Sequence, residues 1–168
     1  MTDPFAIRFK PLDEAGVWEI FTWQYPPPYD VYNLSPETVE LNLPFFLDPQ
    51  NGYYGLWDGA GRLVAFCVFG ADAQVPGGDY SQDALDIGFG LRPDLTGQGY
   101  SQKYLKEVLG YARAHWRAAV YRVTIASFNQ RARRAWEKLG FQLAETFLRE
   151  SDQKLFAVMV LPVLEAEK

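Results

Sequence analysis

The chain has 168 residues, of which 48% are hydrophobic and 16% aromatic, and its formal net charge at pH 7 is −5. This length and composition fit one globular domain spanning residues 1–168 and exclude a disordered chain. The acidic balance argues against a nucleic-acid partner, because extended binding to phosphates needs a dense basic surface.

Other classes of function are disfavoured by what the sequence lacks. The single cysteine, Cys67, lies in an apolar run, so we expect a buried thiol rather than a nucleophile. His115 is the only histidine, and clusters with metal-ligand spacing are absent, so no metal is expected. No signal pattern and no apolar run of membrane-spanning length occurs, which favours a cytoplasmic protein without a membrane partner.

Apolar periodicity, caps and turn residues predict alternating strands and helices. The expected elements are, in chain order, a strand at 6–10, helices at 14–23 and 36–43, strands at 53–57, 62–69 and 85–91, a helix from 101, a strand at 121–126, a helix from 130, and strands at 141–149 and 155–161. Asp13 and Asn129 are typical N-caps, and Gly140 stands where a C-terminal glycine belongs. A helix between two successive strands requires a parallel crossover, whereas the hairpins require antiparallel pairs, so the sheet should be mixed.

Two helices carry a clear apolar face. The first should bury Val17, Trp18, Ile20 and Phe21. The helix from 101 should bury Tyr104, Leu105, Val108, Leu109, Ala112 and Trp116.

The stretch 85–101 combines an unusual strand with a glycine-rich turn. Asp86, Gly88 and Gly90 share one face of the strand, and the two glycines leave that face open to a ligand or mark a twist or bulge. The turn at 96–101 then delivers backbone N–H groups at the start of a helix, where anions bind. This arrangement predicts a phosphate cradle for a nucleotide-like cofactor.

Two short motifs occur about 30 residues apart in the second half of the chain. The segment 96–101 reads Thr-Gly-Gln-Gly-Tyr-Ser, and the segment 129–141 places Asn129, Ala132 and Trp136 ahead of Lys-Leu-Gly-Phe. Both motifs, in this order of elements, resemble those of the GNAT superfamily of acetyl-CoA-dependent N-acetyltransferases. Thr96 replaces the usual Gln or Arg of that family, and Ser101 replaces the usual final Gly or Ala.

The resemblance implies a fold and an activity. It implies a single α/β domain with a central mixed sheet of about seven strands and about four flanking helices. It also implies transfer of an acetyl group from the co-substrate acetyl-CoA to a primary amine of a small molecule or peptide. The amine attacks directly, without a covalent enzyme intermediate, and similar proteins are often homodimers. The alternative is a non-catalytic CoA-binding regulator or a protein-interaction module on the same fold.

The resemblance also implies cofactor-binding residues. The pantetheine arm would follow the backbone of Phe89, Gly90 and Leu91. The pyrophosphate would lie on the motif residues Thr96, Gly97, Gln98, Gly99, Tyr100 and Ser101, with Asn129 and Trp136 beside the arm. Asn129 can serve as an N-cap at the same time. The basic side chains of that helix, Arg131, Arg133, Arg134 and Lys138, either approach the ribose phosphate or form a solvated face.

Catalytic and acceptor residues are the most open part of this interpretation. Asp86 is the best candidate for the base that deprotonates the amine through water, and the alternative is a solvent-facing or structural carboxylate. Trp136 stands where many relatives carry a proton-donating Tyr, and its indole is a poor acid. The departing CoA thiolate could take its proton from Tyr100, from Tyr104, from a Tyr of the early loop or from water. Alternatively, the thiolate could leave unprotonated. The aromatic segment 23–32 would hold the amine through Tyr25, Tyr29 and Tyr32, and the alternative is that rings of this segment pack into the core.

Overall fold

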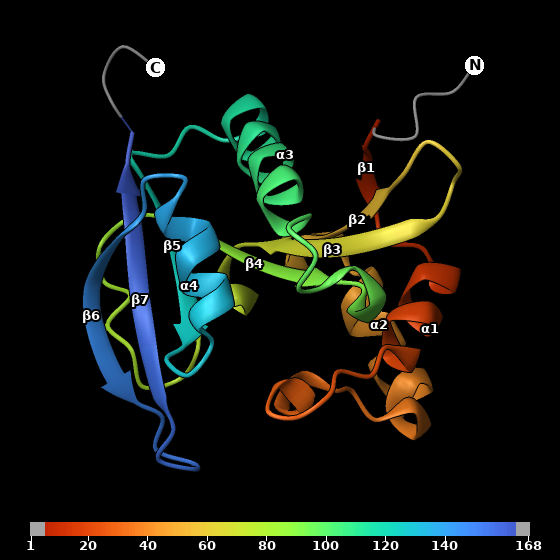
Figure 1. The fold of residues 1–168 in the computed structure, drawn as a ribbon, viewed down its shortest axis with the longest axis horizontal. Helices are drawn as coiled ribbons and strands as arrows, with labels where there is room; N and C mark the ends of the chain where they lie inside the picture. Colours follow the sequence, from red (N-terminus) through yellow and green to blue (C-terminus); the bar gives the residue numbers. More distant parts are fainter. Residues whose placement is uncertain (1–5, 164–168) are drawn as a thin grey trace. The chain divides into compact units, whose positions relative to one another are not determined.

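The computed structural model describes residues 6–163, and within them seven strands form one mixed sheet accompanied by four α-helices (Figure 1). The strands are β1 (Arg8–Pro11), β2 (Tyr53–Trp57), β3 (Leu63–Phe69), β4 (Leu85–Leu91), β5 (Val120–Ala126), β6 (Gln142–Leu148) and β7 (Leu155–Pro162). The helices are α1 (Glu14–Thr22), α2 (Val39–Leu47), α3 (Ser101–His115) and α4 (Gln130–Glu137). The predicted α/β class, strand number and helix number are confirmed.

The sheet has the order β1-β2-β3-β4-β5-β7-β6. The β4–β5 pair is parallel, and it joins Leu85 to Tyr121 and Asp86 to Arg122. The pairs β1–β2, β2–β3, β5–β7 and β6–β7 are antiparallel. The predicted crossover through a helix therefore lies where the sequence places it, between β4 and β5.

Contacts divide the chain into two compact units, Met1–Val68 with Phe89–Ser101 and Phe69–Gly88 with Gln102–Lys168. We call them unit 1 and unit 2 and describe each separately. The predicted domain limits, residues 1–168, stay a prediction, because both ends of that range lie outside the described residues.

Unit 1 has a core built on the first helix. The Asp13 carboxylate accepts a 2.7 Å hydrogen bond from the Gly16 N–H and so caps α1, as predicted. Val17, Ile20 and Phe21 are buried in a cluster with residues of the β2–β3 hairpin. Trp18 is 40% exposed, so its predicted burial is wrong. The side chain lies about 100° round the helix from Val17, at the edge of the buried face.

The second helix is longer than its sequence signals predicted. Residues 36–38 form a 3₁₀ turn, and α2 continues to Leu47 rather than ending near Leu43. Pro44 lies inside this helix, and its carbonyl still accepts a hydrogen bond from the Asp48 N–H. A proline removes one donor from a helix, but the carbonyl remains available, so the last turn closes.

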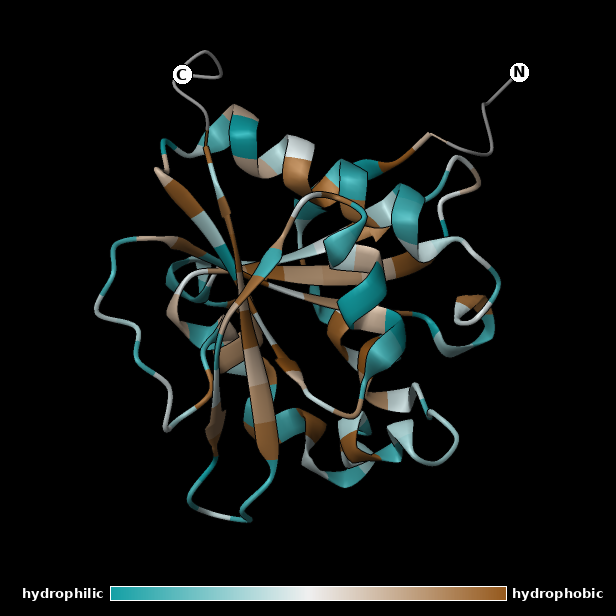
Figure 2. Ribbon diagram, turned by 60° about the vertical axis from the view of Figure 1, so that its left-hand side comes forward, coloured by the Kyte–Doolittle hydropathy of each residue, from teal (hydrophilic) through white to brown (hydrophobic). Residues whose placement is uncertain are grey.

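Unit 2 contains the antiparallel strands β5, β7 and β6, with β7 in the middle (Figure 1). The predicted stripe of α3 is buried from Tyr104 to Ala112. Trp116 follows the end of the helix and packs its ring 4.6 Å from that of Phe69. Several strands are coloured mainly brown in Figure 2, whereas the connecting loops are mostly teal or white, as expected for strands that supply the core.

No helix within residues 6–163 is both long and apolar enough to cross a membrane.

Candidate active site

The glycine-rich turn leaves β4 through Arg92 and a short 3₁₀ turn, Pro93–Leu95. Gly97 and Gly99 have φ angles of 72° and 82°, which glycine adopts at little cost. The turn is exposed from Gly97 to Tyr100, and a Cβ added at Gly99 would meet nothing within 4 Å. The turn runs directly into the first residue of α3, as the cradle prediction requires.

Local hydrogen bonds shape this turn. The Thr96 hydroxyl donates a 2.7 Å bond to the Pro93 carbonyl, and the Gln98 side-chain amide donates to the Asp94 carbonyl. The side chain of Thr96 therefore stabilises the turn itself. Thr96 replaces a long polar residue, and its hydroxyl holds the turn through a bond to the turn's own backbone.

The protein itself covers the glycine-bearing face of β4 at two of its three positions, and the predicted contact of the cofactor arm with the backbone of Phe89, Gly90 and Leu91 stays a prediction. A Cβ at Gly90 would lie 2.3 Å from a ring carbon of Phe66, so this glycine admits an aromatic ring of the neighbouring strand β3. Asp86 lies four residues before Gly90 on the same face, and it is only 4% exposed. Gly90 thus makes room for the Phe66 ring, a role that the apolar–polar alternation of the strand did not indicate.

The aromatic segment reaches the end of β4. The Tyr25 hydroxyl donates a 2.6 Å hydrogen bond to the Leu91 carbonyl, and burial raises the pKa of Tyr25 to about 12. Tyr25 was predicted to bind the amine, and this bond assigns its hydroxyl to the protein backbone. Tyr29 and Tyr32 lie in the 3₁₀ turn that follows the three prolines. Their predicted contact with an amine stays a prediction.

Asp86 faces Arg122 across the parallel β4–β5 pair in unit 2. Arg122 Nε donates to Oδ1 at 2.6 Å, and Nη2 donates to Oδ2 at 2.8 Å. The side-chain amide of Gln74 donates a third bond, 2.9 Å long, to Oδ2. These bonds support the structural alternative for Asp86, and its predicted role as a base stays a prediction.

Arg122 was missed by the sequence analysis, and so was the loop that covers it. Its Nη1 donates to the Gln82 carbonyl at 2.9 Å, and its guanidinium lies 4.8 Å from the centre of the Tyr80 ring. The Tyr80 hydroxyl lies 2.9 Å from the Thr124 hydroxyl and accepts a bond from the Val75 N–H. The polar loop between β3 and β4 is therefore joined to β4 and β5 by partly buried hydrogen bonds.

The second motif forms α4 and its flanks. The Asn129 side chain accepts a 3.1 Å bond from the Ala132 N–H, which confirms the N-cap, and Gly140, just past the end of α4, has a φ of 100°. Trp136 is 4% exposed and packs edge-on against Phe141 at 4.9 Å between ring centres. The indole thus belongs to the core of unit 2, and its predicted contact with the cofactor stays a prediction.

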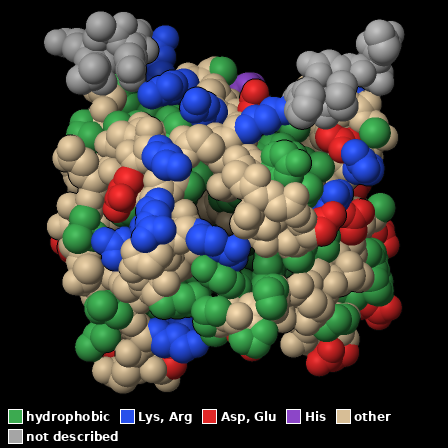
Figure 3. Space-filling model, viewed as in Figure 1, with side chains coloured by type: hydrophobic (Ala, Val, Ile, Leu, Met, Phe, Trp, Pro, Cys, Tyr) green, Lys and Arg blue, Asp and Glu red, His purple; other side chains and the backbone are tan. Residues whose placement is uncertain are grey.

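Basic side chains gather over α4, where Figure 3 shows several Lys and Arg residues. Among the described residues, three buried polar atoms have no hydrogen-bond partner: Gln102 Oε1, Ser127 Oγ and Arg133 Nε. All three lie in unit 2, in or beside segments that the two motifs define. Buried polar atoms without partners are rare in folded proteins and require an explanation.

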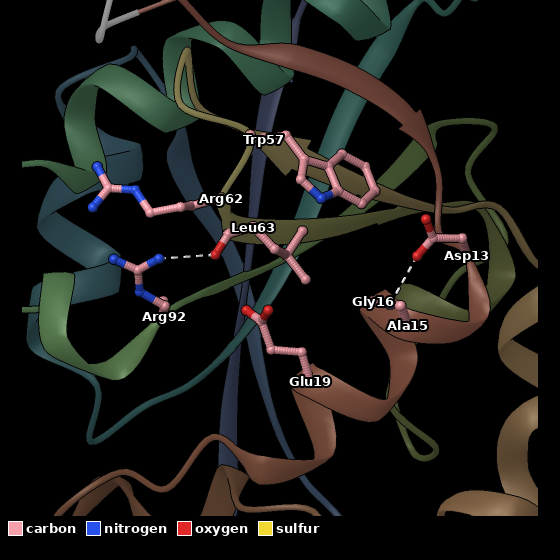
Figure 4. A pocket seen from close by; sticks show the side chains of 9 residues that line it. Asp13, Ala15, Gly16, Glu19, Trp57, Arg62, Leu63 and Arg92 are labelled. Carbon is pink, nitrogen blue, oxygen red and sulfur yellow. Dashed lines mark hydrogen bonds between the residues drawn. The ribbon is translucent and has the colours of Figure 1, made fainter.

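A cavity of about 390 Å³ lies in unit 1, away from the residues predicted from the motifs. Its walls come from α1, the β2–β3 hairpin and Arg92, and Figure 4 shows the guanidinium of Arg92 directed at the Leu63 carbonyl. Arg92 also holds Asp94 through Nε and Nη2, at 2.6 and 3.2 Å. Arg92, which follows the last residue of β4, therefore borders the cavity.

No group of three or more His, Cys, Asp or Glu side chains within residues 6–163 has the arrangement of a metal site.

Comparisons with known proteins identify the family of this chain. A sequence model of the family described as "Acetyltransferase (GNAT) family" matches residues 15–141. No curated protein sequence matches the chain. Because the family model covers well over half of the chain, the chain belongs to the GNAT family of acetyltransferases, an acyltransferase class of enzyme.

Solved structures share the fold at low sequence identity. A chimera of the spermidine N-acetyltransferase SpeG from Vibrio cholerae and hSSAT has a TM-score of 0.71 at 14% identity, covering 93% of this chain and 95% of its own. The yncA protein of Salmonella typhimurium, solved with its cofactor acetyl-CoA, has a TM-score of 0.67 at 18% identity and 95% coverage of both chains. A GNAT-family acetyltransferase of Bacillus anthracis has a TM-score of 0.68 at 17% identity and 96% coverage of both chains.

Proposed function

We propose that this protein transfers the acetyl group of acetyl-CoA to a primary amine of a small molecule or peptide. The observation that carries the proposal is the exposed turn 96–101, whose two left-handed glycines lead into α3 within a chain of the GNAT family. The similar protein yncA was solved with acetyl-CoA, and the SpeG chimera is named for a polyamine substrate. Both facts favour this pairing of co-substrate and acceptor.

The residues present fit the cofactor. Gly99 has open space where a side chain would stand, so a pyrophosphate can approach the backbone N–H groups of the turn. Gln102, which follows the turn directly in the chain, has a side-chain oxygen without a hydrogen-bond partner. Acetyl-CoA would supply the activated acetyl group as a thioester.

The protein's own groups favour direct attack by the amine. Cys67 is fully buried, and burial raises the pKa of its thiol, so it is a poor nucleophile. The backbone of the turn orients the acyl donor, and the loop 24–33 provides aromatic surface for the acceptor. The amine must be neutral when it attacks, and Asp86 remains the proposed base, acting through water.

A titration of the full chain with acetyl-CoA by calorimetry tests the cofactor site. Incubation with acetyl-CoA and a panel of amines, followed by measurement of free thiol, then tests transfer. The panel should contain a polyamine, an aminoglycoside, free amino acids and a short peptide. Binding together with thiol release supports the proposal. Binding without release from any amine points to a non-catalytic CoA-binding regulator, and absence of binding overturns the cofactor site.

Two glycine variants locate the site. Gly99→Val fills the open space of the turn and should weaken acetyl-CoA binding more than about tenfold, the loss of one or two charge-assisted hydrogen bonds. Gly61→Val is the matched control, because Gly61 has a φ of 80° and the same open surroundings in the β2–β3 hairpin. Both variants carry similar backbone strain, so unchanged affinity in Gly99→Val, or equal loss in both, contradicts the placement.

A further inference from the structure

The hydrogen bond between Tyr25 and Leu91 joins two parts of unit 1 that the motifs treat as separate. Tyr25 belongs to the loop 24–33, and Leu91 is the last residue of β4. The two residues are 66 positions apart, and their bond measures 2.6 Å. The Leu91 carbonyl, part of the backbone proposed to bind the cofactor arm, is therefore held by a side chain of the proposed acceptor loop.

The loop itself is built to hold Tyr25 in place. The Asn33 side chain accepts a 2.7 Å bond from the Tyr25 N–H and donates bonds to the Tyr25 carbonyl and to the Gln24 side chain. The Tyr29 N–H donates a 2.8 Å bond to the Pro26 carbonyl. The phenol ring is half-buried, and its raised pKa keeps the hydroxyl protonated as a donor. A displacement of Leu91 is thus transmitted through Tyr25 to the rest of the loop.

On the other side of the bond, Leu91 is continuous with the glycine turn through braced residues. The Arg92 N–H donates a 2.9 Å bond to the Val64 carbonyl, and the Arg92 guanidinium reaches the Leu63 carbonyl. The Leu95 and Thr96 N–H groups donate back to the Arg92 and Pro93 carbonyls. The path from Leu91 to Thr96 therefore has hydrogen bonds along its whole length, and the turn follows at once.

We propose that Tyr25 is a positioning residue that couples the loop 24–33 to the cofactor turn, so that occupation of the turn by CoA orders the loop that receives the amine. This inference rests on the proposed cofactor site at residues 96–101. Its physical basis is that a bound pyrophosphate restricts the turn and β4, and the Tyr25 hydroxyl passes this restriction to the loop. Because coupling between two sites is reciprocal, the ordered loop also strengthens cofactor binding.

Hydrogen exchange with and without CoA tests the coupling, and it needs no knowledge of the acceptor. In the unaltered protein, CoA should slow exchange of the amides in residues 24–33 by about fivefold or more, the lower end of typical coupling energies. In Tyr25→Phe, which keeps the ring and removes the hydroxyl, the slowing should fall below about twofold. Thr22→Val is the control, since it removes a hydroxyl close to the loop whose bond, to the Glu19 carbonyl, stays within α1, and it should keep the effect of CoA.

The outcomes separate this inference from the proposed function. If CoA does not bind the unaltered protein, the cofactor site fails, and the coupling fails with it. If CoA binds and protects the loop equally in Tyr25→Phe and the unaltered protein, the cofactor site stands and the coupling is overturned. A purely structural role for Tyr25 would raise loop exchange by the same factor with and without CoA, and that result also overturns the coupling.

Discussion

Asp86 and Arg122 form a buried bidentate ion pair across the parallel strands β4 and β5. Their two hydrogen bonds measure 2.6 and 2.8 Å, and the two residues are 4% and 3% exposed. Hydrogen bonding to the Asp86 carboxylate raises the pKa of the Arg122 guanidinium, which stays charged at every accessible pH. A charge buried this deeply depends on its partner, so removal of either side chain should destabilise unit 2.

Replacing Asp86 by Asn should cost about 3 kcal/mol of unfolding free energy, because it leaves the Arg122 charge uncompensated in the interior. Urea unfolding measures this loss. The double variant Asp86→Leu with Arg122→Met removes both charges and should recover part of the stability. A loss below about 0.5 kcal/mol in Asp86→Asn would show that the pair contributes no more than an exposed one.

The same variant tests the role of Asp86 in catalysis. If Asp86 is the base, Asp86→Asn flattens the rise of the acetylation rate with pH, because no carboxylate is left to accept the proton. If its role is structural, the folded fraction of the variant keeps the shape of the profile. The rate must be measured at a temperature where the variant is still folded.

Gly90→Ala should destabilise the protein by about 1–3 kcal/mol, because the new methyl group meets the Phe66 ring in a packed site. Adding Phe66→Leu should restore part of this loss by vacating ring volume. Gly110→Ala, in the middle of α3 with nothing within 4 Å of its added Cβ, is the control. That substitution should stabilise the protein by about 0.5–1 kcal/mol. Equal effects of the two alanines would disprove the close contact at Gly90.

Asn129→Ala and Asp13→Ala remove equivalent caps, from α4 and α1. Each side chain accepts one hydrogen bond from a first-turn N–H, so each variant should lose about 1 kcal/mol in thermal or urea unfolding. Only Asn129→Ala should also weaken acetyl-CoA binding, because only Asn129 belongs to the proposed cofactor site. Equal cofactor affinity in the two variants would reduce Asn129 to a cap.

The burial of Tyr25 predicts a pH dependence of stability. An unfolded tyrosine loses its proton near pH 10, whereas Tyr25 in the folded chain keeps its proton to about pH 12. Stability contributed by the neutral phenol is therefore fully present below pH 10 and is lost as the pH rises from 10 to 12. Tyr25→Phe should show a shallower decline of unfolding free energy over that range, and parallel curves would contradict the burial.

Local signals predicted most of the fold because they act within a few residues. The caps Asp13 and Asn129 each bond to an N–H three positions ahead, and Gly140, just past the end of α4, has a positive φ. Errors occurred where tertiary contacts outweighed the local pattern. Trp18 lies at the edge of the buried face of α1 and is partly exposed, whereas Val17 and Phe21 are buried. The helix α2 continues through Pro44.

The site divides in the same way. Residues 96–101 were recognised from the sequence, because a glycine turn before a helix needs particular residue types at fixed spacing. The partners of Asp86, Gly90 and Tyr25 were not recognised. Arg122 is 36 positions from Asp86, and Leu91 is 66 positions from Tyr25, so no short-range pattern connects them.

The amino-acid sequence by itself determined the order of elements, the caps, the glycine turn and the family, since each follows from residue type and local spacing. Only the tertiary structure decided which groups contact β4. Arg122 bonds to Asp86, the Phe66 ring packs against Gly90, and the Tyr25 hydroxyl donates to the Leu91 carbonyl. These contacts arise when distant segments pack side by side, and their selection depends on shape and hydrogen-bond geometry across the sheet.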